Sequence, residues 1–254
     1  MTHAWYRRRY PPLWRQRGSK ASSAHPSTWS GPPLAIAHRG DPMAECENTL
    51  SAFAAAVRQG ADMVEIDLRR TRDGQIVVLH DPTLGRLWGL DQKVSDLDLS
   101  AVQALGHGTQ RIPTLRQVVA DVTVPLMVDF TGGDVVDGAL GVVRDAGAMR
   151  RSLFVSGNVP ALRHLRACAR EARIGLTWIE RGPPPFTLLR ELGAEYWNPT
   201  FRLVTPEGVN DVHDLGLKVS TWTVDQRRHM TRMIEAGVDA IVSNRISRLL
   251  RRLP

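Results

Sequence analysis

Cysteine is scarce in this sequence, and no apolar run in it is long enough to cross a bilayer. The two cysteines, Cys46 and Cys168, show neither CxxC spacing nor a disulfide framework, so we expect free thiols and a reducing, cytoplasmic location. A content of 43% hydrophobic and 23% charged residues is typical of a soluble globular protein. The length of 254 residues suits a single α/β barrel domain.

Acidic residues are missing from the first 30 positions, which contain six of the 33 basic residues. The rest of the chain carries 27 basic against 26 acidic residues, so the net charge of +7 belongs to this segment and nucleic-acid binding is not expected. Residues 1–30 also lack apolar periodicity, which predicts a disordered basic tail. Its arginine triplet is similar to a twin-arginine export signal, but no apolar stretch follows, so we do not expect export. Weak contact of the tail with an anionic membrane is left open.

Short aliphatic runs alternate with segments of helical periodicity from Leu34 onward. This alternation is typical of parallel strands joined by helices, and we expect an α/β fold of the (β/α)8 TIM barrel type. On the first predicted helix, Leu50, Phe53 and Val57 share one face, with Asn48 as the expected N-cap. The nine predicted strands are 34–38, 63–68, 76–80, 125–130, 153–156, 174–178, 196–198, 218–223 and 240–243.

The third predicted strand follows the second too closely to be its parallel neighbour. A parallel return needs about a dozen residues, whereas Asp73-Gly74 is a strong hairpin signal. We therefore expect an extra strand that folds back antiparallel beside the second, outside the eight barrel strands. If the turn has two residues, Asp67 lies opposite His80, which places a histidine beside a carboxylate.

Glu65 and Asp67 are two residues apart in a predicted strand, so both side chains point to the same face, which is the interior in a barrel. Two carboxylates in a confined space repel each other unless a cation or a proton compensates them. Their oxygen atoms suit Mg²⁺ or Ca²⁺. Two solvated acids on an exposed strand are the alternative, but the apolar residues that flank the pair favour the interior.

His38 and His80 each follow an apolar strand, where the catalytic groups of such barrels gather. A single histidine at a strand end is more often structural, but two that converge on a pair of acids favour general acid–base catalysis. Arg39, next to His38, is suited to contact a phosphate anion, the alternative being a surface ion pair.

The two histidines and two acids belong to a longer series of short segments. These are His38-Arg39-Gly40, Glu47-Asn48-Thr49 with Phe53, residues 60–67, residues 71–74, His80-Asp81 with Arg86, residues 112–115, residues 221–224 and residues 237–241. In order and spacing the series resembles the glycerophosphodiester phosphodiesterase family. The resemblance extends over residues 34–246.

The resemblance implies a TIM barrel, a divalent metal, and hydrolysis of glycerophosphodiesters to glycerol 3-phosphate and an alcohol by two histidines. Carried over by position, it implies catalysis by His38 and His80, metal binding by Glu65, Asp67 and Asp129, and substrate binding by Arg39 and Trp222. We expect the substrate to be a small-molecule or lipid-derived phosphodiester. The oligomeric state is left open.

The sequence departs from the family pattern at several positions. Asp129 stands where a glutamate is usual, and Thr131 where a lysine would face the phosphate. Arg39, Lys218 or another nearby arginine is a candidate to replace that charge. The usual Asn and Thr-Asp are replaced by Asp225 and Ser243-Asn244. The lost lysine supports an alternative, a catalytically weakened barrel that binds a phosphorylated ligand.

Residues 81–112 correspond to the insertion that caps the active site in the family, and this insertion is short here. Four apolar residues between positions 88 and 97 predict a small packed lid on the barrel domain, which spans residues 31–250. A short lid predicts an open pocket. A lipid-directed phosphodiesterase related to sphingomyelinase D is therefore a second alternative.

Overall fold

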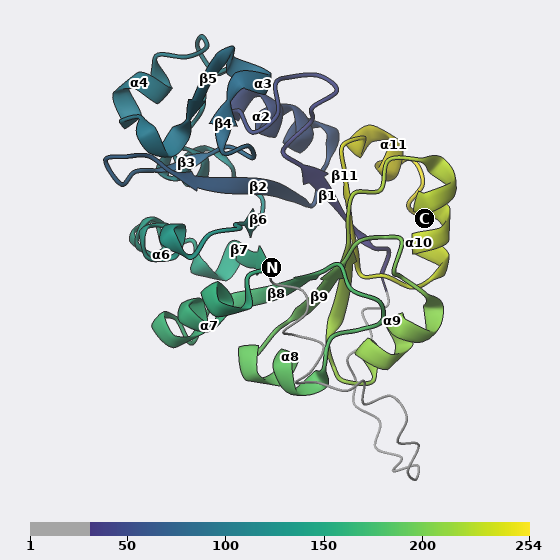
Figure 1. The fold of residues 1–254 in the computed structure, drawn as a ribbon. Coiled ribbons are helices and arrows are strands. Elements are labelled where there is room, and N and C mark those ends of the chain that lie inside the picture. The colour runs from purple at the N-terminus through teal and green to yellow at the C-terminus, as the bar shows by residue number, and fades with distance from the viewer. Residues whose placement is uncertain (1–30) are drawn as a thin grey trace.

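Eight parallel strands close into a barrel in the structure, a computed structural model that describes residues 31–254 (Figure 1). Pairing of the first barrel strand with the last closes the ring. In order around the barrel the strands are β1 (Leu34–His38), β2 (Met63–Arg70), β6 (Leu126–Asp129), β7 (Ser152–Ser156), β8 (Arg173–Trp178), β9 (Tyr196–Pro199), β10 (Lys218–Thr221) and β11 (Ala240–Ser243). The TIM barrel is thus confirmed, while the predicted tail, residues 1–30, lies outside the described residues.

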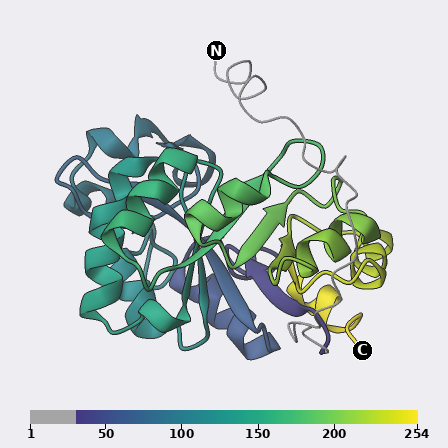
Figure 2. The ribbon, with the colours of Figure 1, turned by 90° about the horizontal axis from the view of Figure 1, so that it is seen from below.

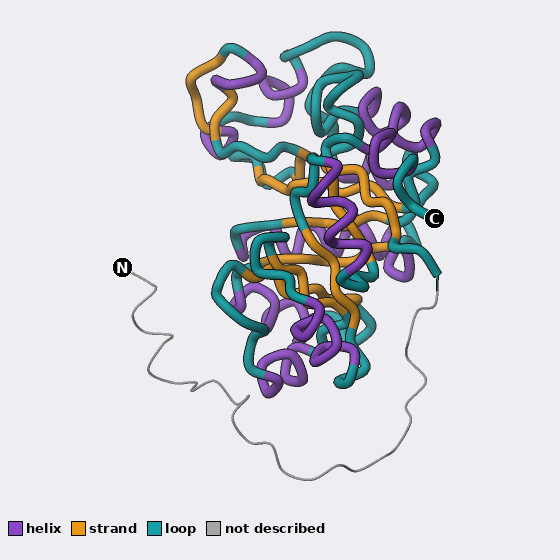
Figure 3. The backbone as a smooth tube through the Cα atoms, turned by 90° about the vertical axis from the view of Figure 1, so that its right-hand side faces the viewer, coloured by secondary structure: helices purple, strands orange, loops and turns teal. Residues whose placement is uncertain are grey.

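A helix follows each barrel strand and packs on the outside, so that the strands lie within a layer of helices (Figure 2). Figure 3 shows the same arrangement from the side, with the strands in orange between purple helices. The helices are α2 (Leu50–Gln59), α5 (Leu115–Asp121), α6 (Val136–Asp145), α7 (Val159–Cys168), α8 (Phe186–Leu192), α9 (Pro206–His213), α10 (Arg227–Glu235) and α11 (Ile246–Leu250), with short 3₁₀ turns at η3 (Gly133–Val135) and η4 (Met149–Arg151). Within residues 31–254, no helix has the length and apolar character needed to cross a membrane.

The N-cap of α2 is Thr49, and the expectation that Asn48 would fill this position was wrong. The side chain of Thr49 accepts a hydrogen bond from the backbone N–H of Ala52 at 3.2 Å. Asn48 instead has a φ of 58° and donates its side-chain amide to Asp67 Oδ2 at 2.8 Å. Both residue types are good N-caps, so only the tertiary contact to Asp67 distinguishes them.

The residues of β2 alternate between the outer layer and the interior of the barrel. Val64, Ile66 and Leu68 pack against the helices, whereas Met63 packs in the interior. Because side chains alternate along a strand, Glu65 and Asp67 share the inward face with Met63. The register places His38 level with Glu65, and Asp129 level with Asp67. Side chains of three adjacent strands are thus brought to one end of the barrel.

The extra strand beside β2 is present as β3 (Ile76–Val78) and is antiparallel, as predicted. Its register differs by one residue from the one we predicted. The backbone N–H of Leu79 donates to Asp67 O at 2.9 Å, so Leu79 rather than His80 lies opposite Asp67.

The turn between β2 and β3 explains the shifted register. The backbone N–H of Thr71 donates to Gln75 O at 3.0 Å, which encloses three residues rather than two. The third of these, Gly74, has a φ of 82°, the left-handed conformation that closes a three-residue hairpin loop. An Asp-Gly pair fits both loop lengths, so the sequence could not choose between them.

Residues 81–112 form a compact insertion between β3 and α5, visible at the upper left of Figure 1. Its elements are β4 (Thr83–Leu84), α3 (Gly85–Trp88), β5 (Leu90–Lys93), η2 (Val94–Asp96) and α4 (Leu99–Gln103). The insertion has an apolar core of its own, in which buried Val94, Val102 and Ile112 pack with the partly buried Trp88 and Leu90.

Candidate active site

A cavity of about 560 Å³ opens at the carboxyl ends of the barrel strands, the end at which barrels of this type carry their active sites. It is lined by all seven residues that the sequence suggested for catalysis, metal binding and substrate binding. They are His38, His80, Glu65, Asp67, Asp129, Arg39 and Trp222. The fold thus brings together residues that are up to 184 positions apart in the chain, from His38 to Trp222.

Three acidic side chains form the floor of the cavity. Glu65, Asp67 and Asp129 each offer a carboxylate oxygen, and these atoms all lie within 4.8 Å of one another. Burial, and then the charges of the other two acids, raise the pKa of Glu65 well above its usual range. Burial and the charge of Asp67 raise the pKa of Asp129 to about 7. An oxygen-rich site in which the ligands repel one another fits a divalent cation, which would relieve the repulsion.

His38 is oriented by a residue at the end of the last barrel strand. Its Nδ1 lies 2.7 Å from Asn244 Oδ1, and its Nε2 lies 3.9 Å from Glu65 Oε2. The orientation of the Asn244 amide is fixed because its Nδ2 donates to Asp225 Oδ2 at 2.9 Å, and a carboxylate can only accept. His38 Nδ1 therefore carries the hydrogen, and the lone pair of Nε2 is free to accept a proton.

Asp225 and Asn244 were noticed in the sequence only as departures from the family pattern. The structure shows that they are partners, since Asp225 Oδ1 also accepts the backbone N–H of Asn244 at 2.9 Å. Relative to the family pattern, the carboxylate and the amide have exchanged positions, and in this chain they are hydrogen-bonded to each other. Burial, and then the charge of Arg39, lower the pKa of His38. A neutral imidazole with a free Nε2 is suited to act as a base.

His80 has a carboxylate partner instead of an amide. Its Nδ1 lies 2.6 Å from Asp81 Oδ1, and Arg86 Nε donates to the other oxygen of Asp81. The hydrogen bond from Arg86 lowers the pKa of Asp81 to about 2. Asp81 is therefore ionised and accepts from His80 Nδ1, which leaves Nε2 of His80 for the reaction.

Glu47 connects the two histidine segments through a pair of arginines. It accepts hydrogen bonds from Arg86 Nη2 at 2.7 Å and from Arg39 Nη1 at 2.8 Å. Burial alone would raise the pKa of Glu47, but the bonds from Arg86 and Arg39 outweigh it and lower the pKa. Arg39 Nε also lies 3.1 Å from Asp67 Oδ2. Arg39 is therefore fixed at the cavity by two carboxylates, and the resemblance had named Glu47 and Arg86 without giving them a role.

Arg69 lies beside Thr131, the residue that stands where the family has a lysine, although Arg69 is not among the residues that line the cavity. Its Nη1 donates to Thr131 Oγ1 at 2.7 Å, and its Nη2 donates to the backbone oxygen of His80. Its positive charge also opposes part of the rise in the pKa of Asp129. Lys218, by contrast, is the first residue of β10 and bonds Glu195 at 3.3 Å, away from the strand ends that form the cavity.

The sequence contained a signal for Arg69 that we did not use. Glu65, Asp67 and Arg69 alternate along one strand, so the pattern that placed the two acids on the inward face also applies to the arginine.

Apolar side chains line the remaining wall of the cavity. Trp222 is fixed by a hydrogen bond from its Nε1 to Asn198 O at 3.0 Å. Trp178, which is buried, and Ile179, whose side chain is 62% exposed, also line the cavity. Glu180 and Asn198 also line the cavity near these residues, so this wall combines apolar surface with polar groups.

The fold and the cavity together are typical of a TIM-barrel enzyme, with three acids that could hold a cation and two histidines in one cavity. Residues 38–248 match the glycerophosphoryl diester phosphodiesterase family. The chain is 31% identical over 227 residues to a glycerophosphodiester phosphodiesterase of Caldanaerobacter subterraneus subsp. tengcongensis, with 83% of this chain and 93% of that protein covered. The chain belongs to this family and is an enzyme of the glycerophosphodiester phosphodiesterase class.

The chain is also similar to a plant relative in sequence and to a solved structure in fold. Glycerophosphodiester phosphodiesterase GDPD4 of Arabidopsis thaliana is 27% identical over 263 residues, which cover 92% of this chain and 79% of that protein. The fold is similar, with a TM-score of 0.80 and 24% identity, to an Oleispira antarctica phosphodiesterase in complex with the product sn-glycerol-3-phosphate. That comparison covers 87% of this chain and 96% of the other.

Proposed function

We propose that this enzyme hydrolyses glycerophosphodiesters to glycerol 3-phosphate and an alcohol, with Mg²⁺ or Ca²⁺ as cofactor and with His38 and His80 as general base and general acid. The observation that carries the proposal is the meeting of two histidines and three acids in one cavity. The product in the Oleispira antarctica relative supports the same product here.

Glu65, Asp67 and Asp129 would hold the cation, and all three provide oxygen atoms. Hard oxygen donors favour Mg²⁺ or Ca²⁺ over softer metals. A cation bound there supplies positive charge to the phosphodiester and polarises a phosphoryl oxygen. Asp129 reaches the site although it is one methylene shorter than the glutamate usual in the family. Asn48 orients Asp67 through the hydrogen bond at 2.8 Å from its side-chain amide.

His38 is assigned as the general base. Its Nδ1 hydrogen is committed to Asn244, and its lowered pKa keeps the ring neutral at neutral pH. The Nε2 atom can then remove a proton from the attacking hydroxyl, which is either water or a hydroxyl group of the substrate's glycerol. In the second case the alcohol departs to leave a cyclic phosphate, and a water molecule then opens this ring to give glycerol 3-phosphate.

His80 is assigned as the general acid. The ionised Asp81 accepts from Nδ1 and compensates the positive charge that the ring carries when Nε2 also holds a proton. That proton passes to the oxygen of the departing alcohol as the phosphorus–oxygen bond breaks. His38 ends β1 and His80 lies just after β3, and both line the same cavity.

Two residues of the cavity wall, with Arg69 close behind it, bind and orient the substrate in this proposal. Arg39 contacts a phosphoryl oxygen with the part of its guanidinium that Glu47 and Asp67 leave free. Arg69 contributes positive charge beside Thr131. Trp222 forms the apolar wall against which the glycerol carbons pack.

The proposal is tested by measuring release of glycerol 3-phosphate from glycerophosphocholine with Mg²⁺ or Ca²⁺. We expect His38→Ala and His80→Ala each to lower the rate by about 10²-fold or more, because general acid–base groups contribute about 10²- to 10⁴-fold. Calorimetry should show that both variants still bind the cation, whereas Asp129→Asn should weaken cation binding. His107→Ala, an exposed histidine outside the cavity residues, is the matched control. Full activity in either His38→Ala or His80→Ala would refute the assignment.

Thr131 supports a second candidate function, a barrel that binds a phosphorylated ligand without turning it over. Arg69 argues against it, because an arginine beside Thr131 supplies the charge that the missing lysine would have provided. Binding of glycerol 3-phosphate by the full chain, with no hydrolysis of any glycerophosphodiester at saturating Mg²⁺ or Ca²⁺, would favour this candidate.

The exposed Ile179 at the cavity supports the lipid-directed alternative, because an apolar side chain there can contact an acyl chain. Comparing the rates with lysophosphatidylcholine and with glycerophosphocholine decides between a lipid-directed enzyme and one that acts on small glycerophosphodiesters. A preference for the lysolipid that is lost in Ile179→Ser would identify a lipid-directed enzyme.

A further inference from the structure

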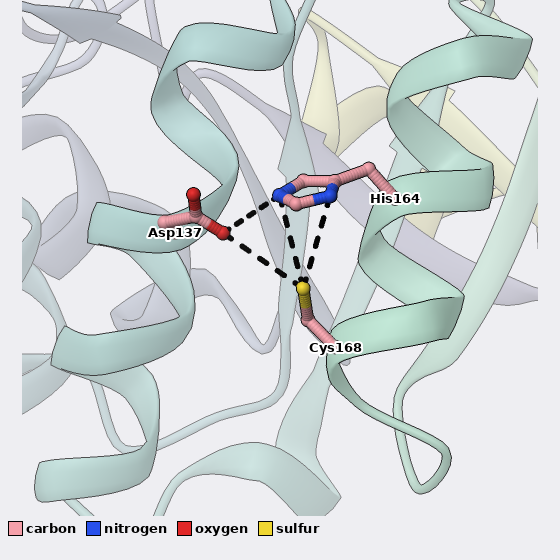
Figure 4. A group of neighbouring side chains, drawn as sticks. All are labelled: Asp137, His164 and Cys168. Carbon is pink, nitrogen blue, oxygen red and sulfur yellow. Dashed lines mark hydrogen bonds and ion pairs between the residues drawn. The ribbon is translucent and has the colours of Figure 1, made fainter.

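Three potential metal ligands converge on the outer surface of the barrel, where α6 lies beside α7 (Figure 4). They are Asp137, in the first turn of α6, and His164 and Cys168, which are four residues apart on α7. All three are exposed, and none lines the active-site cavity. Residues four apart on a helix share a face, so both α7 side chains are directed toward α6.

The distances between the three ligand atoms are close to those of a tetrahedral zinc site. His164 Nε2 lies 2.8 Å from Asp137 Oδ1, and Cys168 Sγ lies 3.7 Å from His164 Nε2 and 3.9 Å from Asp137 Oδ1. Zinc bonds of about 2.0–2.3 Å at tetrahedral angles separate such ligand atoms by roughly 3.4–3.6 Å. Each separation can reach this range by a shift of about 0.6 Å or less, which exposed side chains accommodate by small rotations.

The chemistry of the donors selects the class of metal. A thiolate, an imidazole and a carboxylate together favour Zn²⁺ and its substitute Co²⁺ over Mg²⁺ or Ca²⁺. The acidic trio in the cavity has oxygen donors only, so the two sites differ in their preferred metal. The helices are also joined beside the cluster, since Arg144 of α6 donates to the backbone oxygen of Cys168 at 2.7 Å.

A nucleophilic Cys–His–Asp arrangement uses the same residue types, but the geometry does not support it. Cys168 Sγ lies 3.8 Å from His164 Nδ1 and 3.7 Å from Nε2, so it faces the ring without being in line with either nitrogen. A histidine that activates a thiol directs one nitrogen at the sulfur and the other at the carboxylate. Here Nε2 is directed at Asp137 and also lies nearest the sulfur, as expected when one nitrogen, one sulfur and one oxygen surround a common point.

We propose that Asp137, His164 and Cys168 bind one zinc-type cation, with water in the fourth position, and that the cation links α6 to α7. An exposed ion pair such as that of His164 with Asp137 contributes little stability by itself. A cation that binds only the folded protein stabilises it in proportion to the logarithm of the metal concentration.

The test is a Co²⁺ titration of the reduced full-length protein in excess Mg²⁺, followed by absorption spectroscopy. We expect a thiolate-to-Co²⁺ charge-transfer band that saturates at about one equivalent and disappears when Zn²⁺ is added. Oxygen ligands in the cavity cannot produce this band, so it reports on a cysteine alone. The band should be absent in Cys168→Ser and persist in Cys46→Ser, which is the matched control. His164→Ala should weaken Co²⁺ binding at least about 10-fold, as loss of one ligand requires.

Thermal unfolding separates loss of the metal site from loss of the fold. Without added metal, Cys168→Ser should unfold at the same temperature as the wild type; with Zn²⁺, only the wild type and Cys46→Ser should be stabilised. No thiolate band at one equivalent of Co²⁺, or a band that survives in Cys168→Ser, would overturn the proposal.

Discussion

His38 Nδ1 donates a hydrogen bond to Asn244 Oδ1 over 2.7 Å, although the two residues are 206 positions apart. The bond joins the end of β1 to the residue that follows β11, where the barrel closes. Asp225 fixes the Asn244 amide from the other side. The tautomer of His38 is therefore set by residues near the end of the chain.

Substitution of Asn244 should change the pH profile as well as the rate. We expect Asn244→Ala to lower kcat by about 10-fold or more with little change in KM, because His38 loses its orientation but the substrate contacts remain. In Asn244→Asp, a carboxylate beside Nδ1 should raise the pKa of His38, which moves the acidic limb of kcat/KM to higher pH. Asn210→Ala, at an exposed position of α9, is the control. An unchanged profile in Asn244→Asp would argue that Asn244 does not act on His38.

The acidic trio predicts opposite effects of pH on the protein with and without its cation. In the folded protein the pKa of Asp129 is raised from 3.8 to about 7. The folded state therefore binds more protons than the unfolded chain between these values. The ionisation of Asp129 should therefore decrease the free energy of unfolding of the chelator-treated protein as the pH rises from about 4 through about 7, and the raised pKa of Glu65 acts in the same direction.

Thermal unfolding at about pH 5 and about pH 7.5 checks this expectation, since these values lie below and above the pKa of about 7 at which Asp129 ionises in the folded protein. Mg²⁺ or Ca²⁺ should stabilise the protein more at the higher pH, where Asp129 is ionised. Asp129→Asn should flatten the pH dependence of the chelator-treated protein, whereas Asp121→Asn, at an exposed position of α5, should leave it unchanged. Stability that rises with pH in the chelator-treated wild type would contradict the raised pKa.

The two histidines should respond differently to the quality of the leaving group. A general acid matters less when the departing alcohol is already acidic, as in a p-nitrophenyl phosphodiester. We therefore expect His80→Ala and Asp81→Ala to lose at least about 10-fold less activity on that substrate than on glycerophosphocholine. His38→Ala should lose activity on both. Kinetics on the two substrates measure the difference, and equal losses in His80→Ala would place the acid elsewhere.

Arg69 should contribute to substrate binding. Loss of one charge-assisted hydrogen bond costs about 1.5–3 kcal/mol, so Arg69→Met should lower kcat/KM by roughly 10- to 100-fold. The double variant Arg69→Met/Thr131→Lys should recover part of this loss, because a lysine then stands where the family has one. Arg70→Met, at the exposed end of β2, is the matched control. Wild-type kinetics in Arg69→Met would show that another cation serves the phosphate.

Elements with strong local patterns were predictable from the sequence. The strand predicted at 240–243 has the same bounds as β11, because four consecutive aliphatic or small residues are bounded by polar ones. The alternation of residues also placed Glu65 and Asp67 on one inward face. Both inferences depend on the geometry of a single strand.

The features that the sequence did not predict depend on tertiary contacts or on turn conformation. The register of β3 follows from Gly74 in a three-residue loop, a choice that the residue types alone do not make. Asn48 and Thr49 are both suitable N-caps, and only the contact with Asp67 decides between them. The pairing of Asp225 with Asn244 becomes visible only after the barrel closes.

Closure of the barrel between β1 and β11 has a consequence for the timing of catalysis during synthesis. A ribosome makes His38, His80 and the three acids within the first 129 residues, yet Asn244 is more than a hundred residues later. Until β11 has been made and has paired with β1, His38 lacks the hydrogen bond to Asn244 that sets its tautomer. We therefore expect the arrangement around His38 to form only after the last barrel strand has joined the sheet.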